Sequence, residues 1–246
     1  MKTIQNQIAD KQMEIALHPF FRRLEANEAL RNVLPIASGL SFWAMGFQDI
    51  LRLNEERVSH PLMKQVARHH RGEDAGHDKW FLSDLLKIEG QNPDVRALFS
   101  RQHAATRDAT YALMAEVFRA RTDEERIVLL LTLEAAVHVF FGKLAGYFER
   151  QSINGLQYFS CDRAEVKHKH EVFEQQVGEA VGGITLSEEL QARCQALVER
   201  AFAAFAALFD RLDTLVAASA AATATETSRA PRRERRVSVG EQRQVA

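Results

Sequence analysis

Cysteine, proline and glycine are all scarce in this chain. Two cysteines, Cys161 and Cys194, cannot make a disulfide framework in a chain of 246 residues, and such low usage suits a reducing cytosol. Five prolines and twelve glycines give few turn signals. We therefore expect long helices rather than many short strands.

Neither sign of charge is in excess. The chain has 32 Lys and Arg against 33 Asp and Glu, so its composition gives no signal for nucleic acid or for a membrane surface. The segment 1–21 lacks the apolar core of a signal peptide, and the apolar stretch 33–47 is interrupted by Pro35 and too short to span a bilayer. We expect a cytoplasmic protein, a monomer or a homodimer, with no nucleic-acid or membrane partner.

Nearly every segment has apolar residues at the 3.6-residue spacing of an amphipathic helix. The predicted helices, which are about seven in number, span residues 3–24, 35–57, 61–88, 93–120, 123–151, 156–179 and 187–218. From near Ala217 onward the chain lacks large apolar residues apart from scattered valines, so it cannot bury a core there. The sequence predicts an all-α domain over 1–218 and a disordered basic tail over 219–246.

Three of the predicted helices carry clusters of histidine and acidic side chains. In the first and third clusters the spacing is i, i+4 and i+7, and in the second it is i, i+4, so each cluster shares one helix face. The members are His70, Asp74 and His77 with Glu73 beside them, then Glu134 and His138, then Cys161, Glu165 and His168. Whether the three faces converge decides whether they form one site.

The most specific feature is a repeated carboxylate-x-x-His pair. Asp74 precedes His77 by three residues, and Glu165 precedes His168 by the same distance, with Glu134 on the helix between them. Carboxylate di-iron and di-manganese bundles use two such pairs together with further carboxylates from other helices. The spacing therefore predicts a metal centre.

Each feature also has an interpretation without metal. An Asp-x-x-His pair is common on solvated helix faces, and Glu134, although its neighbours are apolar, could be satisfied by a bond to His138. Asp49 is the candidate for a fourth carboxylate, and Glu73 and Cys161 are candidates for additional ligands or for partners of the ligands.

Phenylalanines accompany these clusters. Phenylalanines at helical spacing usually build the bundle core, although a helical core can also enclose an apolar ligand. The candidates for lining a substrate pocket are Phe42, Phe140, Phe141 and Phe159.

At these residues the chain resembles a known group of proteins. The opening "HPFF" at 18–21, the pair Gln48-Asp49 and the predicted helices resemble the heme-oxygenase-like superfamily, over roughly residues 15 to 215. That group includes thiaminase-II-type proteins and the cofactor-independent oxidase of pyrroloquinoline quinone synthesis. The segments "HHRGEDAGHDKWFLSDL" and "YFSCDRAEVKHKH" are most similar to its diiron branch, the iron-containing redox enzymes. The resemblance implies a heme-oxygenase-like bundle, whereas a ferritin-like bundle is the rival architecture for the same ligands.

The diiron branch implies metal roles for His77, Glu134, Glu165 and His168. This chain departs from the family pattern at three places. Cys161 stands where the family usually has a histidine, His70 stands where it often has a glutamate, and no acid is near Ser41, so that Asp49 would have to replace the early glutamate. His70 or His138 would then supply the missing imidazole. These departures are compatible with two metal ions, one or none.

The expected function is that of a non-heme diiron oxidase or oxygenase, with two ferrous ions that activate dioxygen on a small, partly apolar metabolite. Iron supplies the redox chemistry, and the protein supplies ligand geometry and a dry pocket. Two alternatives belong to other classes: a metal-free helical module that binds a small molecule or a protein, and a cofactor-independent oxidase that uses histidines as acid–base groups.

Overall fold

The fold is an assembly of α-helices. The computed structural model describes residues 1–91, 94–153, 155–159 and 184–229, and within these ranges it contains helices and no strand, which confirms the predicted all-α class. The elements are α1 (Lys2–Ala16), α2 (Pro19–Glu25), α3 (Leu30–Val33), α4 (Ile36–Gly39), α5 (Ser41–Arg57), α6 (Pro61–Asp74), α7 (His77–Glu89), α8 (Val95–Leu98), the 3₁₀ turn η1 (Arg101–His103), α9 (Ala104–Arg119), α10 (Asp123–Arg150) and α12 (Glu188–Arg229).

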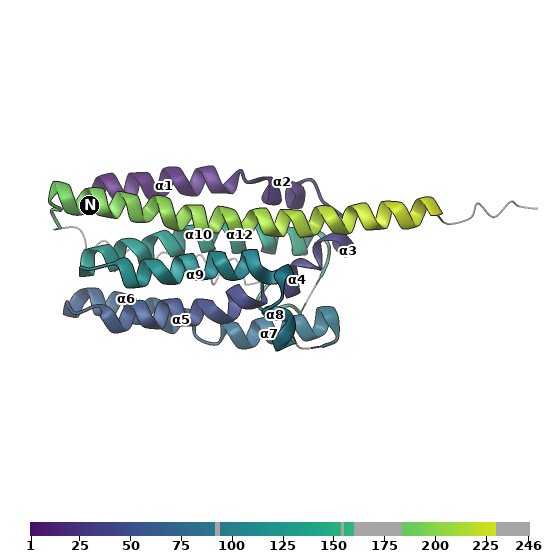
Figure 1. The fold of residues 1–246 in the computed structure, drawn as a ribbon, viewed down its shortest axis with the longest axis horizontal. Coiled ribbons are helices and arrows are strands. Elements are labelled where there is room, and N and C mark those ends of the chain that lie inside the picture. Colours follow the sequence, from purple (N-terminus) through teal and green to yellow (C-terminus); the bar gives the residue numbers. More distant parts are fainter. Residues whose placement is uncertain (92–93, 154, 160–183, 230–246) are drawn as a thin grey trace, which may run out of the picture.

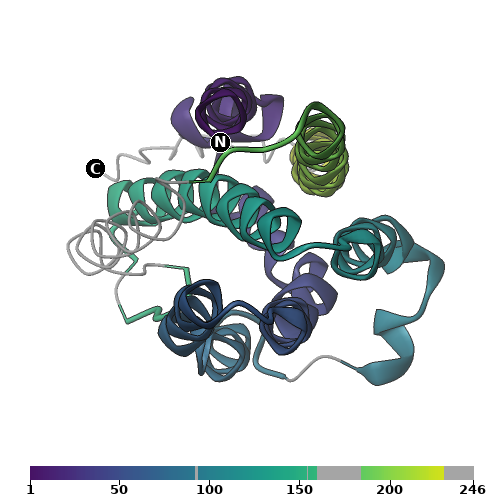
Figure 2. The same cartoon turned by 90° about the vertical axis from the view of Figure 1, so that its left-hand side faces the viewer.

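Helix α10 is the central element. Viewed along the bundle, it lies between a layer that contains α1 and α12 and a second layer that contains α5 and α6 (Figure 2). Helix α9 closes one side by packing against both α5 and α12 (Figure 1). Side chains on α10 therefore face both layers.

The sequence of α10 explains its central place. Thr122 and Glu125 form a capping box, in which the Glu125 amide donates to the Thr122 hydroxyl at 3.3 Å and Glu125 accepts from the Thr122 amide at 3.0 Å. Among the described helices α10 alone is long and apolar enough to cross a membrane, and 56% of its most apolar window is buried inside the protein. That burial is what the core helix of a bundle requires.

Four of the predicted helices are interrupted, so the described residues form more helical segments than the seven expected. The predicted helix 35–57 is divided into α4 and α5. The predicted helix 3–24 stops before Pro19, where the His18 ring nitrogen Nδ1 accepts from the Phe20 amide at 3.2 Å as the N-cap of α2. The predicted helix 61–88 breaks between α6 and α7 at Gly76, whose φ of +93° favours glycine. The segment 93–120 contains α8, η1 and α9 instead of one helix.

Helix α12 ends later than the sequence analysis predicts. It continues to Arg229, past the expected domain end at residue 218. The Thr223 hydroxyl donates to Asn32 Oδ1 at 3.2 Å, so this extension contacts the segment around α3. Alanine has the highest helix propensity, and an alanine-rich stretch can continue a helix without burying a core. The predicted tail residues 230–246 and most of the predicted helix 156–179 lie outside the described residues.

Candidate metal centre

Two predicted ligands from different helices meet directly. His70 Nε2 on α6 lies 2.6 Å from Glu134 Oε2 on α10. His70 is buried, with 6% of its surface exposed, and the Glu134 side chain is 20% exposed. Burial alone lowers the pKa of His70, but the hydrogen bond to Glu134 and the charges of Glu134, Asp74 and Glu73 together raise that pKa above its ordinary value. This contact joins the first histidine and acid cluster to the second.

The Asp74–His77 pair spans the break between α6 and α7. His77 Nδ1 lies 2.7 Å from Asp74 Oδ1, although the two residues belong to separate helices and not to one continuous helix as predicted. The Gln48 side-chain amide on α5 donates to Asp74 Oδ2 at 2.5 Å and to the Asp74 carbonyl oxygen at 2.9 Å. Both carboxylate oxygens of Asp74 are thus occupied, one by His77 and the other by Gln48.

The second ring nitrogen of His77, Nε2, differs from Nδ1 in its hydrogen bonding. Nε2 is buried, and within the described part of the chain it has no hydrogen-bond partner. The ring lies beside Trp80 at a centroid distance of 4.8 Å and near Phe141 of α10 at 6.4 Å. If Nδ1 carries the proton that bonds Asp74, Nε2 presents a lone pair. An imidazole oriented by a carboxylate through its other nitrogen is the usual arrangement of a metal-ligating histidine.

The two pairs lie along one face of α10. Glu134, His138 and Phe141 are spaced i, i+4 and i+7 on that helix, and therefore share a face. His70 contacts the first of these residues and His77 lies near the last, two helical turns or about 10 Å further along. We call the five residues His70, Asp74, His77, Glu134 and His138 the polar strip.

The polar strip is not a complete metal site by itself. Within the described ranges no group of three His, Cys, Asp or Glu side chains is arranged so that it could hold a metal ion. The predicted ligands Glu165 and His168, and Cys161 beside them, lie outside the described residues. The strip offers imidazole and carboxylate donors with a lone pair at His77 Nε2, so its donor set fits part of a site for iron, manganese or zinc.

Two further candidates lie away from the strip. Asp49 is on an exposed face of α5, with 59% of its side chain exposed, and pairs with Arg52 at 2.9 Å. The preceding residue, Gln48, is rotated by about 100° on the helix and reaches Asp74 in its place. Glu73 pairs with His69 at 3.2 Å on the same helix. The prediction that Asp49 supplies a fourth ligand therefore does not agree with its position.

The predicted pocket phenylalanines fall into two groups. Phe140 and Phe141 contact each other at a centroid distance of 5.3 Å, and Phe141 contacts Tyr158 at 5.1 Å, next to Phe159. Phe42 belongs to a separate group, where it contacts Phe99 at 5.7 Å and Tyr111 at 5.3 Å. The aromatic cluster near His77 is thus formed by Phe140, Phe141, Tyr158 and Phe159, without Phe42.

Sequence reasoning gave no role to Asp84, which anchors the segment after α10. Its carboxylate is fully buried and accepts from the amides of Gln157, Tyr158 and Phe159 at 2.9, 2.7 and 3.2 Å. An aspartate on a helix that also exposes polar residues resembles a surface acid, so its spacing carried no signal. Asp84 ties α7, the helix of His77, to the chain that leads towards residue 160.

The comparisons with known proteins supply no family for this fold and site. Neither the protein-family models nor the curated proteins that were compared with the chain match it.

Proposed function

We propose that this chain is a metal-dependent oxidase or oxygenase of the heme-oxygenase-like type, acting on a small, partly apolar molecule. The observation that carries the proposal is the environment of His77. Its Nδ1 is 2.7 Å from a carboxylate that Gln48 also holds, and its Nε2 is buried and without a hydrogen-bond partner in the described ranges. A buried polar atom left without a partner costs about 1–3 kcal/mol, which a bound metal ion would offset.

The residues of the polar strip would have different roles in binding the metal. His77 would bind one metal ion and Glu134 a second, and His70 would bind the second ion or hold the Glu134 carboxylate in place. Asp74 would orient His77 from behind, because both of its oxygens are already occupied. Glu165 and His168 are the proposed remaining ligands, which the family resemblance implies. Two ferrous ions, the cofactor we favour, would supply the electrons for dioxygen chemistry.

The surroundings of the strip favour an apolar substrate. Phe141 and Trp80 flank the His77 ring, and Tyr158 packs against Phe141 at 5.1 Å. Aromatic side chains at this end would exclude water and contact a hydrocarbon portion of the substrate. We therefore propose a substrate such as a fatty acid or an amino acid derivative, in the cytoplasm.

One observation favours a second candidate, a metal-free helical binding module. His70 with Glu134 and His77 with Asp74 are each already hydrogen-bonded pairs within the protein. Such pairs could satisfy the buried polar groups without any metal. On this alternative, loss of Glu134 would change stability and nothing else.

Iron binding separates the two candidates. The full chain would be loaded with ferrous iron without oxygen, desalted, and its iron content and oxygen consumption measured. We expect iron binding in the unmodified protein, a loss of iron in His77→Ala and Glu134→Ala, and an affinity about 10–100-fold lower in Asp74→Asn. The matched control is His60→Ala, because His60 is an exposed histidine at the start of α6.

Two results would overturn the proposal. Unmodified protein that takes up no iron, with Glu134→Ala changing only the melting temperature, would establish the binding module instead. Iron uptake without oxygen consumption on any fatty acid or amino acid derivative tested would remove the oxidase assignment and leave a metal site.

A further inference from the structure

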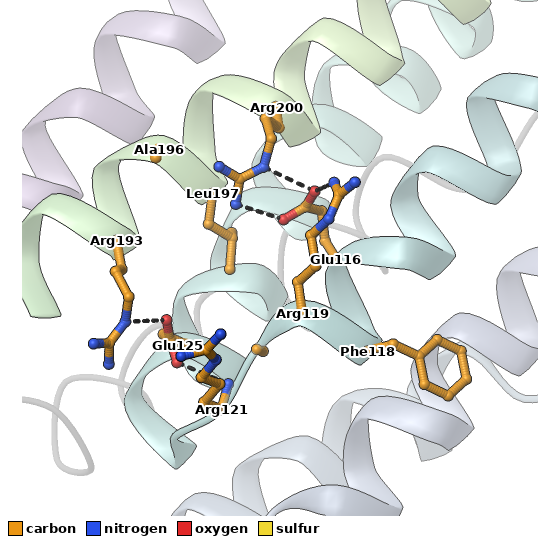
Figure 3. Close-up of a pocket in the computed structure, with 10 residues that line it drawn as sticks. Glu116, Phe118, Arg119, Arg121, Glu125, Arg193, Ala196, Leu197 and Arg200 are labelled. Carbon is orange, nitrogen blue, oxygen red and sulfur yellow. Dashed lines mark hydrogen bonds and ion pairs between the residues drawn. The ribbon is translucent and has the colours of Figure 1, made fainter.

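A second cluster of charged residues lies away from the polar strip, where the end of α9, the start of α10 and the first part of α12 meet. A pocket of about 610 Å³ opens there (Figure 3). Its charged lining consists of Glu116, Arg119, Arg121, Glu125, Arg193 and Arg200. Four guanidinium groups stand against two carboxylates in the lining, and Glu189, outside the lining, pairs with Arg193 at 2.8 Å, so the arginines remain in excess by one positive charge.

The two carboxylates lie beneath the arginines. Glu116 and Glu125 are 2% and 4% exposed, and their oxygens are engaged by the protein. Arg200 binds both oxygens of Glu116 at 2.9 Å, and Arg193 binds Glu125 at 2.9 Å. The backbone amides of Arg121 and Thr122 donate to the other Glu125 oxygen at 2.8 and 3.0 Å. The buried carboxylates therefore orient the guanidinium groups and have little capacity left for other partners.

The guanidinium groups form the accessible part of the pocket. Side-chain exposures are 59% for Arg119, 45% for Arg200 and 34% for Arg193. Arg121 also lines the pocket, and it holds Glu125 through its backbone amide, at 2.8 Å, and not through its guanidinium group. Arg119 also pairs with Glu116 at 2.5 Å. A guanidinium group has five N–H donors in a planar fork, so an arginine that is already in an ion pair keeps further donors for a ligand.

We propose that this arginine pocket binds a phosphate-bearing small molecule. A phosphate monoester carries about −1.5 to −2 charges at pH 7, so the positive lining of the pocket attracts it. Arginine forks bind phosphate oxygens in pairs. The volume of about 610 Å³ lies within the range of small-molecule sites, about 300–1,000 Å³, and leaves room for an organic portion beside the phosphate.

The pocket is independent of the proposed metal centre. Glu125 precedes Glu134 by nine residues on α10, or about 13 Å along the helix, and none of the strip residues lines the pocket. Ligand binding at the arginine pocket can therefore be tested independently of the proposed oxidase activity. The ion pairs of Arg193 and Arg200 also hold α12 against α10 and α9, but this packing role does not require Arg121.

Arg121 is accordingly the residue to change. The full chain would be titrated with pyrophosphate in low-salt buffer by isothermal calorimetry, with citrate as a polycarboxylate comparison. We expect one saturable site for pyrophosphate, tighter than for citrate, and about tenfold weaker binding in Arg121→Ala. Arg22→Ala is the matched control, since Arg22 is an exposed arginine on α2, outside the pocket, and should bind as the unmodified chain does.

Arg119→Ala provides a second variant, with an expected loss similar to that of Arg121→Ala, and the melting temperature of each variant shows whether it is folded. The proposal is overturned if pyrophosphate gives no saturable binding, or if Arg121→Ala and Arg22→Ala bind equally well. Tighter binding of citrate than of pyrophosphate would overturn the assignment to a phosphate-bearing ligand.

Discussion

Replacing Asp84 by alanine should destabilise the protein more than most single substitutions. The fully buried carboxylate accepts three backbone amides at 2.7–3.2 Å and lies 3.3 Å from Lys87 Nζ. Tyr158 and Phe159 are themselves buried, so their amides would lose their partner without gaining water. At about 1–3 kcal/mol for each unsatisfied buried group, Asp84→Ala should lower the free energy of unfolding by about 3–5 kcal/mol.

The assay is urea unfolding followed by far-UV circular dichroism. Asp84→Asn keeps one acceptor oxygen and should lose about half as much stability. The matched control is Asp108→Ala on α9, an exposed aspartate whose loss should stay within about 0.5 kcal/mol. If Asp84→Ala were as mild as this control, Asp84 would not anchor the segment 157–159, and the reasoning would be refuted.

Three other measurements test separate parts of the structure. Cys194 is fully buried, and burial, together with the nearby Glu125 charge, raises the pKa of its thiol to about 11. A Cys161→Ser variant, in which Cys194 is the remaining cysteine, should therefore react with a disulfide reagent at neutral pH only after denaturation. Reaction in the native state would contradict this. Burial raises the pKa of Glu125, but the Arg121 amide, Arg193 and the Thr122 amide together hold it below its ordinary value of 4.5. The ionised form of Glu125 is therefore favoured in the folded state, and Glu125→Gln should lower the free energy of unfolding by about 1–2 kcal/mol at pH 7. This difference in stability should shrink as the pH falls below 4.5 and through the folded pKa, and a difference independent of pH would contradict the reasoning. Truncation after Ala218 should cost about 1 kcal/mol in urea unfolding, because it removes the Thr223–Asn32 hydrogen bond, and an unchanged midpoint would show that this contact contributes nothing.

The periodicity of the sequence was enough to predict the class of fold and several helix boundaries. The start of α10 agrees with the capping box of Thr122 and Glu125, and its central place agrees with its apolar composition. The break at Gly76 could not be predicted, because an isolated glycine inside a periodic segment is tolerated in a helix, as Gly72 is in α6. The position of Asp74 beside His77 survives the break, because the turn brings the two side chains together again.

The candidate site was harder to predict than the fold. The pairing of His70 with Glu134 joins the amphipathic helix α6 to the apolar helix α10, where each helix turns one polar residue towards the other. Gln48 could not be assigned to Asp74 from spacing, since the contact depends on how α5 rotates against α6 and α7. The arginine pocket could not be predicted for a similar reason. Its four arginines come from α9, from the loop that precedes α10, and from α12, and only the packing of these elements brings them together.

The most direct test of the proposed metal centre is the position of iron in a crystal of the full chain loaded under anaerobic conditions. Anomalous scattering at the iron edge locates the ions without reference to any assumed ligand. We expect one iron peak about 2.1 Å from His77 Nε2, with Asp74 on the far side of the His77 ring, and a second iron peak with Glu134 among its ligands. An iron peak elsewhere, or no iron with His77 Nε2 hydrogen-bonded to a protein group, would contradict it.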